Sequence, residues 1–162
     1  MYSPVTRRRR RLVDSHDKTE VHGAGSHLIV TIVTPSGTRA EYNVRHVRVP
    51  GIEGDYGVLK GHIPFMTALR SGALIIDLDK EQKIWAVSGG FSEVHADRVT
   101  ILAETAEPAE SIDLERSESS RKRALKRLAE RNMIQNFDAT RAHASLARAI
   151  NRIEVASGLG HN

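Results

Sequence analysis

Arginine side chains recur at helical spacing near the C-terminal end of this 162-residue chain. Arg148 and Arg152 lie four residues apart, and Arg123 belongs to the preceding stretch of helix-forming residues. A guanidinium donates paired hydrogen bonds to phosphate oxygens, so arginines on adjoining helix faces can converge on a phosphate group. The carboxylate of Asp113 could then accept a hydrogen bond from a hydroxyl or a purine amino group. The same pattern also fits a charged, solvated helix face, so it indicates anion binding without requiring it.

No arrangement of residues typical of an enzyme accompanies these arginines. Ser88 occurs in Val-Ser-Gly rather than in the Gly-x-Ser-x-Gly of hydrolases. Residues 57–62 lack the Gly-Lys-Ser/Thr end of a phosphate-binding loop. The chain has no cysteine, and among its eight histidines only His16, His22 and His27 could loosely chelate a metal. We therefore expect no catalytic residues, no metal site and no required cofactor.

The segment Val49–Pro64 contains four glycines and two prolines within sixteen residues. This spacing excludes a helix and predicts tight turns around one short strand. An ordered loop of this kind more often presents a contact surface than fills a gap. Glu53, Asp55 and Lys60 would suit reversible polar contact with a partner, or they are ordinary solvated turn residues. His62 is either a hydrogen-bonded turn residue or a further contact.

The formal net charge of +4 is concentrated in an N-terminal tail. Arg7–Arg11 carries five positive charges, which leaves 4 − 5 = −1 for the rest of the chain. Broad binding of a phosphate backbone by the folded part is therefore not supported. Residues 1–26 contain few apolar side chains and are expected to be disordered, without the apolar region of a secretory signal. The tail is either a solvated extension or a binding site for anionic lipid or nucleic acid.

Short apolar segments alternate with turn residues from His27 to Glu104. Alternation with period two is typical of strands, and Gly89-Gly90 interrupts one of them. The pattern predicts an antiparallel β-sandwich or barrel over residues 27–108. The expected strands cover residues 28–33, 39–49, 56–59, 66–69, 73–78, 83–88, 91–95 and 98–104.

Helix formers replace glycine beyond Pro108. Ser111 or Asp113 can cap a first helix that runs to about Arg131. Its apolar positions are few, so the helix is only weakly amphipathic.

A second helix is expected over residues 139–157, with Asp138 as its N-cap and Gly158 as its terminator. The two helices would form a hairpin over residues 109–157, followed by a short tail, 158–162. Small side chains at the seam bury little area, so this hairpin should dock marginally and be able to leave its partner. The apolar residues of the second helix lie on one face: Ala139, Ala142, Leu146, Ala149, Ile150 and Ile153.

Four sequence blocks, taken in order, match the pattern of one protein family. Val49–Thr67 fits V-P-G-x-x-G-x-x-G-[VI]-L-P-G-H-x-P-x-x-[TS], except that Lys60 replaces a proline. Ala86–Val94 is similar to [VL]-S-G-G-[FI]-x-E-V, and Val99–Glu107 to V-T-[VI]-L-A-[DE]-x-A. Ala147–Ala156 is similar to the family's last helix. On these blocks the chain resembles the epsilon subunit of bacterial F-type ATP synthase over residues 27–157.

The resemblance implies a non-catalytic rotor subunit with a β-sandwich and a C-terminal helical hairpin. Its partners would be the gamma subunit, the c-ring and the alpha/beta catalytic head, at the cytoplasmic face of the bacterial cell membrane. The subunit would help couple proton flow to ATP synthesis, and its hairpin would inhibit ATP hydrolysis. In this family the loop that carries Glu53, Asp55, Lys60 and His62 faces the c-ring.

The resemblance also implies a regulatory ATP site. Residues 112–117 are similar to the I/L-D-x-x-R-A motif of family members that bind ATP, with Ser117 in place of alanine. Basic residues of the second helix, Arg141, Arg148 and Arg152, would meet acidic loops of the head when the hairpin extends. The ATP ligands implied by the motif are Ile112, Asp113, Arg116, Arg123, Arg148 and Arg152.

Two other classes of protein fit the sequence less well. A small nucleic-acid-binding β-barrel needs aromatic side chains along one sheet face. The chain has seven aromatic residues, which form no obvious stacking row, so no nucleic-acid partner is expected. A free-standing enzyme is the weakest alternative because the chain shows no catalytic constellation.

Overall fold

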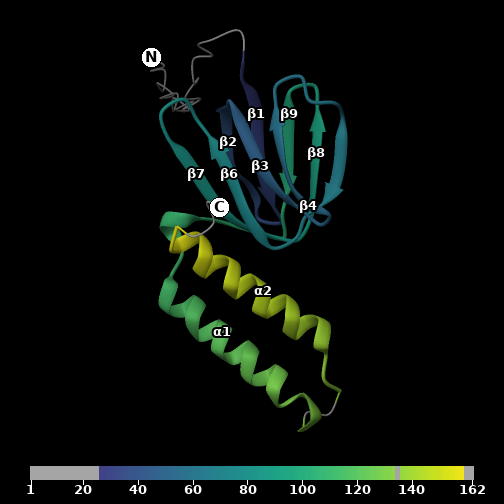
Figure 1. Ribbon diagram of the computed structural model, residues 1–162, viewed down its shortest axis with the longest axis vertical. Coiled ribbons are helices and arrows are strands. Elements are labelled where there is room, and N and C mark those ends of the chain that lie inside the picture. Colours follow the sequence, from purple (N-terminus) through teal and green to yellow (C-terminus); the bar gives the residue numbers. More distant parts are fainter. Residues whose placement is uncertain (1–25, 134–135, 159–162) are drawn as a thin grey trace, which may run out of the picture.

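The computed structural model describes residues 26–133 and 136–158. Two five-stranded sheets pack face to face, and a hairpin of two helices extends from one end of them (Figure 1). This arrangement confirms the predicted β-sandwich followed by a helical hairpin. The prediction of a disordered tail concerns residues almost wholly outside the described part of the chain, as do Arg7–Arg11, His16 and His22.

The first sheet has the strand order β2-β1-β9-β8-β5. Its pairs are antiparallel except for β1 with β9, which run parallel. Its strands are β1 (Leu28–Thr34), β2 (Gly37–Val44), β5 (Phe65–Ala68), β8 (Phe91–His95) and β9 (Arg98–Leu102).

The second sheet has the order β10-β7-β6-β3-β4 and is antiparallel throughout. Its strands are β3 (His46–Gly51), β4 (Gly54–Leu59), β6 (Gly72–Asp77), β7 (Gln82–Ser88) and β10 (Thr105–Pro108).

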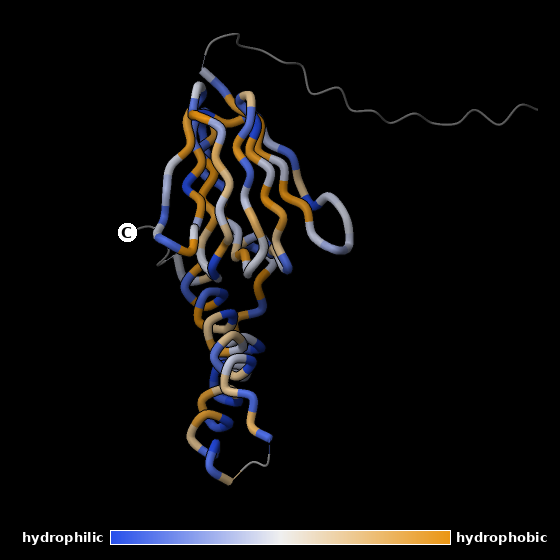
Figure 2. Tube along the Cα trace, turned by 90° about the vertical axis from the view of Figure 1, so that its right-hand side faces the viewer, coloured by the Kyte–Doolittle hydropathy of each residue, from blue (hydrophilic) through white to orange (hydrophobic). Residues whose placement is uncertain are grey.

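Alternating side chains of both sheets form the core of the sandwich. In β1 the side chains of Leu28, Val30 and Ile32 are fully buried, whereas the residues between them are half-buried on the outer face. Burial of branched aliphatic side chains from facing sheets supplies most of the stabilisation, at about 25 cal/mol per Å² of apolar surface. Figure 2 shows these hydrophobic segments running through the sandwich and more hydrophilic segments along the helices.

The chain crosses from the second sheet to the first at Gly89-Gly90, between β7 and β8. Gly90 has a φ of +99°, and its carbonyl accepts a hydrogen bond from Leu69 N at 2.9 Å. A Cβ atom at Gly90 would lie 1.9 Å from the Leu102 carbonyl oxygen. Only glycine fits this corner, which fixes how the two sheets meet.

Two details of the predicted strands are wrong. The expected strand over residues 39–49 is broken at Arg45, where β2 ends and the chain enters β3 in the other sheet. Thr105–Pro108, expected to lie after the last strand, forms β10 at the edge of the second sheet. Pro108 is tolerated there because an edge strand has a free side that needs no backbone donor.

The helical hairpin begins and ends close to the expected positions. Helix α1 (Leu114–Ala129) is capped by Asp113, which accepts a hydrogen bond from Arg116 N at 2.9 Å. Helix α2 (Ala139–Ala156) is capped by Asp138 in the same way, through Arg141 N. Short 3₁₀ segments, η1 (Ala109–Ser111) and η2 (Arg131–Met133), precede and follow α1. No helix in the described part of the chain is long and apolar enough to cross a membrane.

Small side chains line the seam between α1 and α2, as expected. Ser117, Ala124, Ala142 and Ala149 are buried. Ile150 was expected on the buried face of α2, but its side chain is exposed. The adjacent polar residue, Asn151, is buried instead.

Candidate functional site

Helix α2 carries the contacts that hold the hairpin against the sandwich. Asn151, 4% exposed, donates a hydrogen bond from Nδ2 to the Val87 carbonyl oxygen of β7 at 3.0 Å. One residue further on, the Arg152 guanidinium donates two hydrogen bonds of 2.9 Å to the Glu107 carboxylate of β10. Since a bidentate ion pair is geometrically selective and a buried amide needs its partner, both contacts specify one docked position.

The Arg152 pair forms one wall of a groove, here called the Arg152 groove, of about 250 Å³. It lies where α1 begins, next to the end of β10 and the C-terminal half of α2. Residues from all three elements line it: Glu107, Ser111, Asp113, Arg116, Ser117, Ser120, Ala149 and Arg152.

The N-terminal cap of α1 holds two of the predicted ATP ligands, Asp113 and Arg116, in this groove. Because Asp113 caps α1, its carboxylate is held at the helix N-terminus, one turn from the exposed Arg116. The hydroxyl of Ser117, which departs from the alanine of the motif, donates to the Asp113 carbonyl oxygen at 2.7 Å. The additional hydroxyl is therefore satisfied within the helix and does not disturb the groove.

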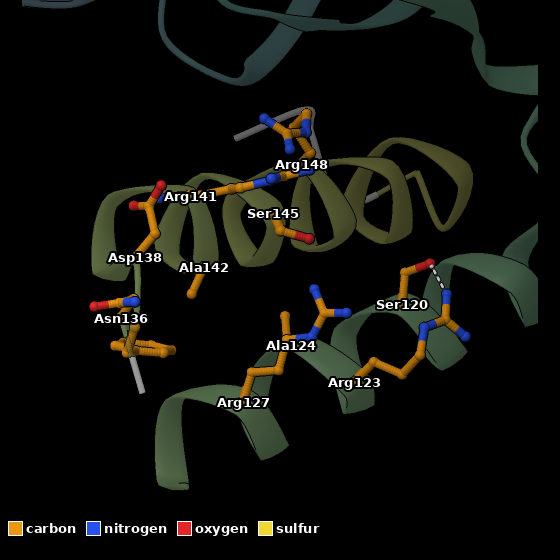
Figure 3. A pocket seen from close by; sticks show the side chains of 11 residues that line it. Ser120, Arg123, Ala124, Arg127, Asn136, Asp138, Arg141, Ala142, Ser145 and Arg148 are labelled. Carbon is orange, nitrogen blue, oxygen red and sulfur yellow. Dashed lines mark hydrogen bonds between the residues drawn. The ribbon is translucent and has the colours of Figure 1, made fainter. Parts of the chain in front are cut away.

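A second groove, here called the Arg127 groove, lies between the two helices further from the sandwich and has a volume of about 560 Å³. Arg123 and Arg127 of α1 and Arg141 and Arg148 of α2 are among the residues that line it. In Figure 3 the Arg127 guanidinium lies between the helices, whereas Arg141 and Arg148 lie on the side of α2 away from α1. Ser120 lines both grooves.

The six predicted ATP ligands are thus divided between two places. The Arg152 groove brings together Asp113, Arg116 and Arg152. Arg123, which donates to Ser120 Oγ at 2.8 Å, and Arg148 line the Arg127 groove instead. Ile112 is half-buried before α1 and lines neither groove.

The three arginines expected to meet the catalytic head lie on one face of α2 but have different surroundings in this docked hairpin. Arg141 and Arg148 line the Arg127 groove, and Arg152 is paired with Glu107. Sequence reasoning missed Glu107 and Asn151 because their partners lie 45 and 64 residues away. It also missed Arg127, which follows Arg123 by four residues and could have been found from that spacing.

The four residues expected on one contact loop lie at opposite ends of β4. Glu53 lies in the β3–β4 turn, and Asp55, the second residue of β4, pairs with Arg70. Lys60 and His62 follow the far end of the strand, where His62 Nδ1 and the Ile63 carbonyl oxygen are 2.8 Å apart. Because a strand rises about 3.3 Å per residue, Asp55 and Lys60 are separated by about 16 Å.

An exposed apolar patch, which the sequence analysis did not identify, lies on the outer face of the first sheet. It comprises Met66 of β5, Phe91 of β8 and Leu102 of β9, whose side chains are 63%, 55% and 45% exposed. Phe91 pairs directly with Leu102 and with Ala68 on the neighbouring strands. This is here called the Phe91 patch, and clustered exposed apolar residues of this kind mark contact surfaces.

Titratable side chains of the sandwich form hydrogen bonds with one another that stabilise the fold. Desolvation opposes ionisation of Asp77, but hydrogen bonds from Gln82 and His46 and the charges of His46 and Arg48 hold the pKa of its carboxyl below the ordinary value. His27 hydrogen-bonds to Asp79 at 3.0 Å. Within residues 26–133 and 136–158, no group of three or more histidines and carboxylates could hold a metal ion.

Comparison with known proteins assigns both parts of the fold. Residues 27–109 match the beta-sandwich domain of the ATP synthase delta/epsilon chain, and residues 110–157 match its long alpha-helix domain. The ATP synthase epsilon chain of Bacillus velezensis is 46% identical over 127 residues, which cover 78% of this chain and 95% of that protein. The epsilon chain of Halalkalibacterium halodurans is 46% identical over 129 residues, covering 80% and 96%.

A solved structure shares the whole fold. A chain in the cryo-EM structure of the Euglena gracilis mitochondrial ATP synthase, OSCP/F1/c-ring, superposes with a TM-score of 0.60 at 21% identity. The alignment covers 98% of this chain and 97% of that one. The two matched domains and the relatives above show that the protein belongs to the ATP synthase delta/epsilon chain family.

Proposed function

We propose that this chain is the epsilon subunit of a proton-translocating F-type ATP synthase, a non-catalytic part of the rotor. The observation that carries the proposal is the match of both domains, end to end, to the family whose bacterial members are named ATP synthase epsilon chain. In this role the sandwich links the gamma subunit to the c-ring, and the hairpin regulates ATP hydrolysis. The protein would lie peripherally at the cytoplasmic face of the bacterial cell membrane.

The Phe91 patch is the surface best suited to the gamma subunit. Its side chains project from three neighbouring strands of a rigid sheet, so a partner helix could bury them without any rearrangement of the sandwich. Aromatic and methionine side chains at the centre of an interface contribute a large share of the binding energy.

Phe91→Asp is expected to weaken binding of the cognate gamma subunit by at least about tenfold, because a charge would then be desolvated at the interface. Binding of purified gamma to immobilised full-length chain would measure the effect. Leu125→Asp is the matched control, since Leu125 is 47% exposed on α1 and distant from the patch. Equal binding by both variants would show that gamma docks elsewhere.

The end of the sandwich that carries the β3–β4 turn supports a contact with the c-ring. Glu53 is exposed at this turn, and Asp55 stands beside it, partly neutralised by Arg70. Lys60 and His62 follow the other end of β4, about 16 Å along the strand from Asp55. We assign the c-ring contact to Glu53 and Asp55 and leave Lys60 and His62 outside it.

The Arg152 groove is suited to hold a regulatory ATP while the hairpin is docked. Arg116 and Arg152 would donate to phosphate oxygens, and the Asp113 carboxylate would accept from a hydroxyl or the adenine amino group. Because the groove is made of β10, α1 and α2 together, it exists only in the docked form. ATP would therefore favour that form by binding it better than the extended one.

In the extended form, Arg141, Arg148 and Arg152 become available to acidic loops of the alpha/beta head. The Glu107–Arg152 pair must break for this change, and the Asn151–Val87 hydrogen bond must break with it. Because each contact contributes only on the order of 1 kcal/mol, the docked and extended forms can lie close in free energy.

A further inference from the structure

The turn between β8 and β9 holds two residues in the left-handed region of backbone conformation. His95 and Arg98 are the last paired residues of the two strands, so Ala96 and Asp97 form a two-residue turn. Their φ angles are +47° and +59°. Asparagine and glycine are preferred in such turns because most other side chains are strained there. Strain of this kind persists only where the surrounding structure fixes it, so the contacts of this turn are informative.

Asp97 joins three separate segments of the sandwich. Its carbonyl oxygen accepts a hydrogen bond from Ile29 N at 2.9 Å, at the start of β1. Its carboxylate accepts a second hydrogen bond from Gly61 N at 2.7 Å, in the connection between β4 and β5. A hydrogen bond from a backbone N–H to a carboxylate is charge-assisted and is stronger than one between neutral groups. The β8–β9 turn therefore holds the β4–β5 connection, which lies outside its own pair of strands.

The Gly61 contact falls within a second tight turn. The Leu59 carbonyl oxygen accepts a hydrogen bond from His62 N at 3.1 Å, and Gly61 has a φ of +80°. These are the features of a type II turn, in which proline is favoured at the second residue. Lys60 occupies this position, where the family pattern quoted above has proline. Because proline fixes its own φ and lysine does not, the turn in this chain depends more strongly on the Asp97 hydrogen bond.

The Leu59–His62 turn begins a loop that presents apolar side chains to solvent. Leu59 and Ile63 are 60% and 73% exposed. The loop leads directly into β5, the edge strand of the first sheet, whose Met66 belongs to the Phe91 patch. The exposed side chains of the loop therefore continue that patch beyond the start of β5, and such continuous apolar surface marks a contact region.

We propose that Asp97 is a positioning residue for partner binding, which holds the Leu59–His62 turn in the form that gamma binds. The inference rests on the proposed function, because gamma is the partner assigned to the adjoining Phe91 patch. A loop that is ordered before binding loses little conformational freedom at the interface, so the affinity is higher. Asp97 need not touch the partner, since it acts through the Gly61 backbone N–H.

Backbone ¹⁵N relaxation of the free full-length chain tests the hydrogen bond itself. Asp97→Gly removes the carboxylate but keeps a residue that accepts a positive φ, so the β8–β9 turn should survive. The order parameters of Gly61 and His62 should fall from about 0.85 to below about 0.6. Ala96→Gly relieves strain in the same turn without removing the carboxylate, and Asp97→Asn keeps an oxygen that can accept from Gly61 N. Both control variants should leave the two order parameters unchanged.

Lys60→Pro tests whether the hydrogen bond acts by ordering the turn. Proline at this position restrains a type II turn by itself, so Lys60→Pro/Asp97→Gly should recover most of the order that Asp97→Gly loses. A general structural role of Asp97 in the sandwich would not be rescued by a substitution in another loop. Absence of recovery would show that Asp97 does not act through the Leu59–His62 turn.

Binding of purified cognate gamma to the immobilised full-length variants completes the test. Asp97→Gly should raise the Kd at least about threefold, whereas Ala96→Gly and Asp97→Asn should stay within about twofold of the wild type. The loss should largely disappear when Asp97→Gly is compared with Asp97 in the Lys60→Pro background. If the wild type does not bind gamma, the proposed function falls and the positioning role falls with it. If the wild type and all variants bind gamma equally, or if Asp97→Gly leaves the loop ordered, the positioning role alone is overturned.

Discussion

Asn151→Asp is expected to release the helical hairpin from the sandwich. The Asn151 side chain is 4% exposed, and its Nδ2 donates to the Val87 carbonyl oxygen. An aspartate there would place a carboxylate against that oxygen, with the donor lost and a charge desolvated. The combined cost is on the order of 3 kcal/mol or more, which exceeds what the remaining Glu107–Arg152 pair contributes.

The absence of cysteine makes this release directly measurable. Spin labels on Arg39→Cys in β2 and Lys122→Cys in α1 occupy exposed positions in the two domains. The wild-type background should give one narrow distance distribution, and Asn151→Asp a broad one. Asn132→Asp makes the same chemical change at an exposed position in η2 and should leave the distribution narrow. An unchanged distribution for Asn151→Asp would mean that other contacts dock the hairpin.

Gly90→Ala is expected to cause a large loss of stability in the sandwich itself. Alanine would be strained at a φ of +99°, at a cost of about 1–2 kcal/mol. Its Cβ would also overlap the Leu102 carbonyl oxygen, a backbone atom that cannot rotate away, and relieving this overlap should cost at least about 2 kcal/mol more. The corner between the two sheets must shift to accommodate the side chain.

Gly61→Ala separates backbone strain from steric overlap. Gly61 has a similar φ of +80°, but a Cβ there would meet no atom within 4 Å. Urea unfolding followed through Trp85, the single tryptophan and a core residue, reports the sandwich. Gly90→Ala should lower the free energy of unfolding by at least about 2 kcal/mol more than Gly61→Ala does. Equal losses would show that the overlap is relieved by a small backbone movement.

Local signals were sufficient to predict most of the fold. Asp113 and Asp138 act as helix N-caps because a short side chain can reach the free backbone N–H groups of the first turn. Gly158 ends α2 with a φ of +72°. β10 was missed because its four residues contain little hydrophobic alternation and end in proline, so only pairing with β7 reveals the strand.

The candidate sites were less predictable because they depend on contacts between distant segments. The sequence predicted a short strand within the glycine-rich segment, but the four contact residues were all assigned to one loop, and β4 separates Glu53 from Lys60 by the length of a strand. The arginines were correctly expected on adjoining helices, yet helix spacing alone could not divide them between two grooves. Glu107 and Asn151 act through partners that no local pattern identifies.

ATP hydrolysis by a reconstituted alpha/beta head with gamma tests whether this chain is an epsilon subunit whose hairpin regulates the enzyme. The head would receive either the full chain or a chain stopped after Pro108, which retains β10 and removes the hairpin. We expect both chains to incorporate and only the full chain to slow hydrolysis. Equal hydrolysis rates with both chains incorporated would contradict a regulatory hairpin, and failure of both to incorporate would contradict the assignment as an epsilon subunit.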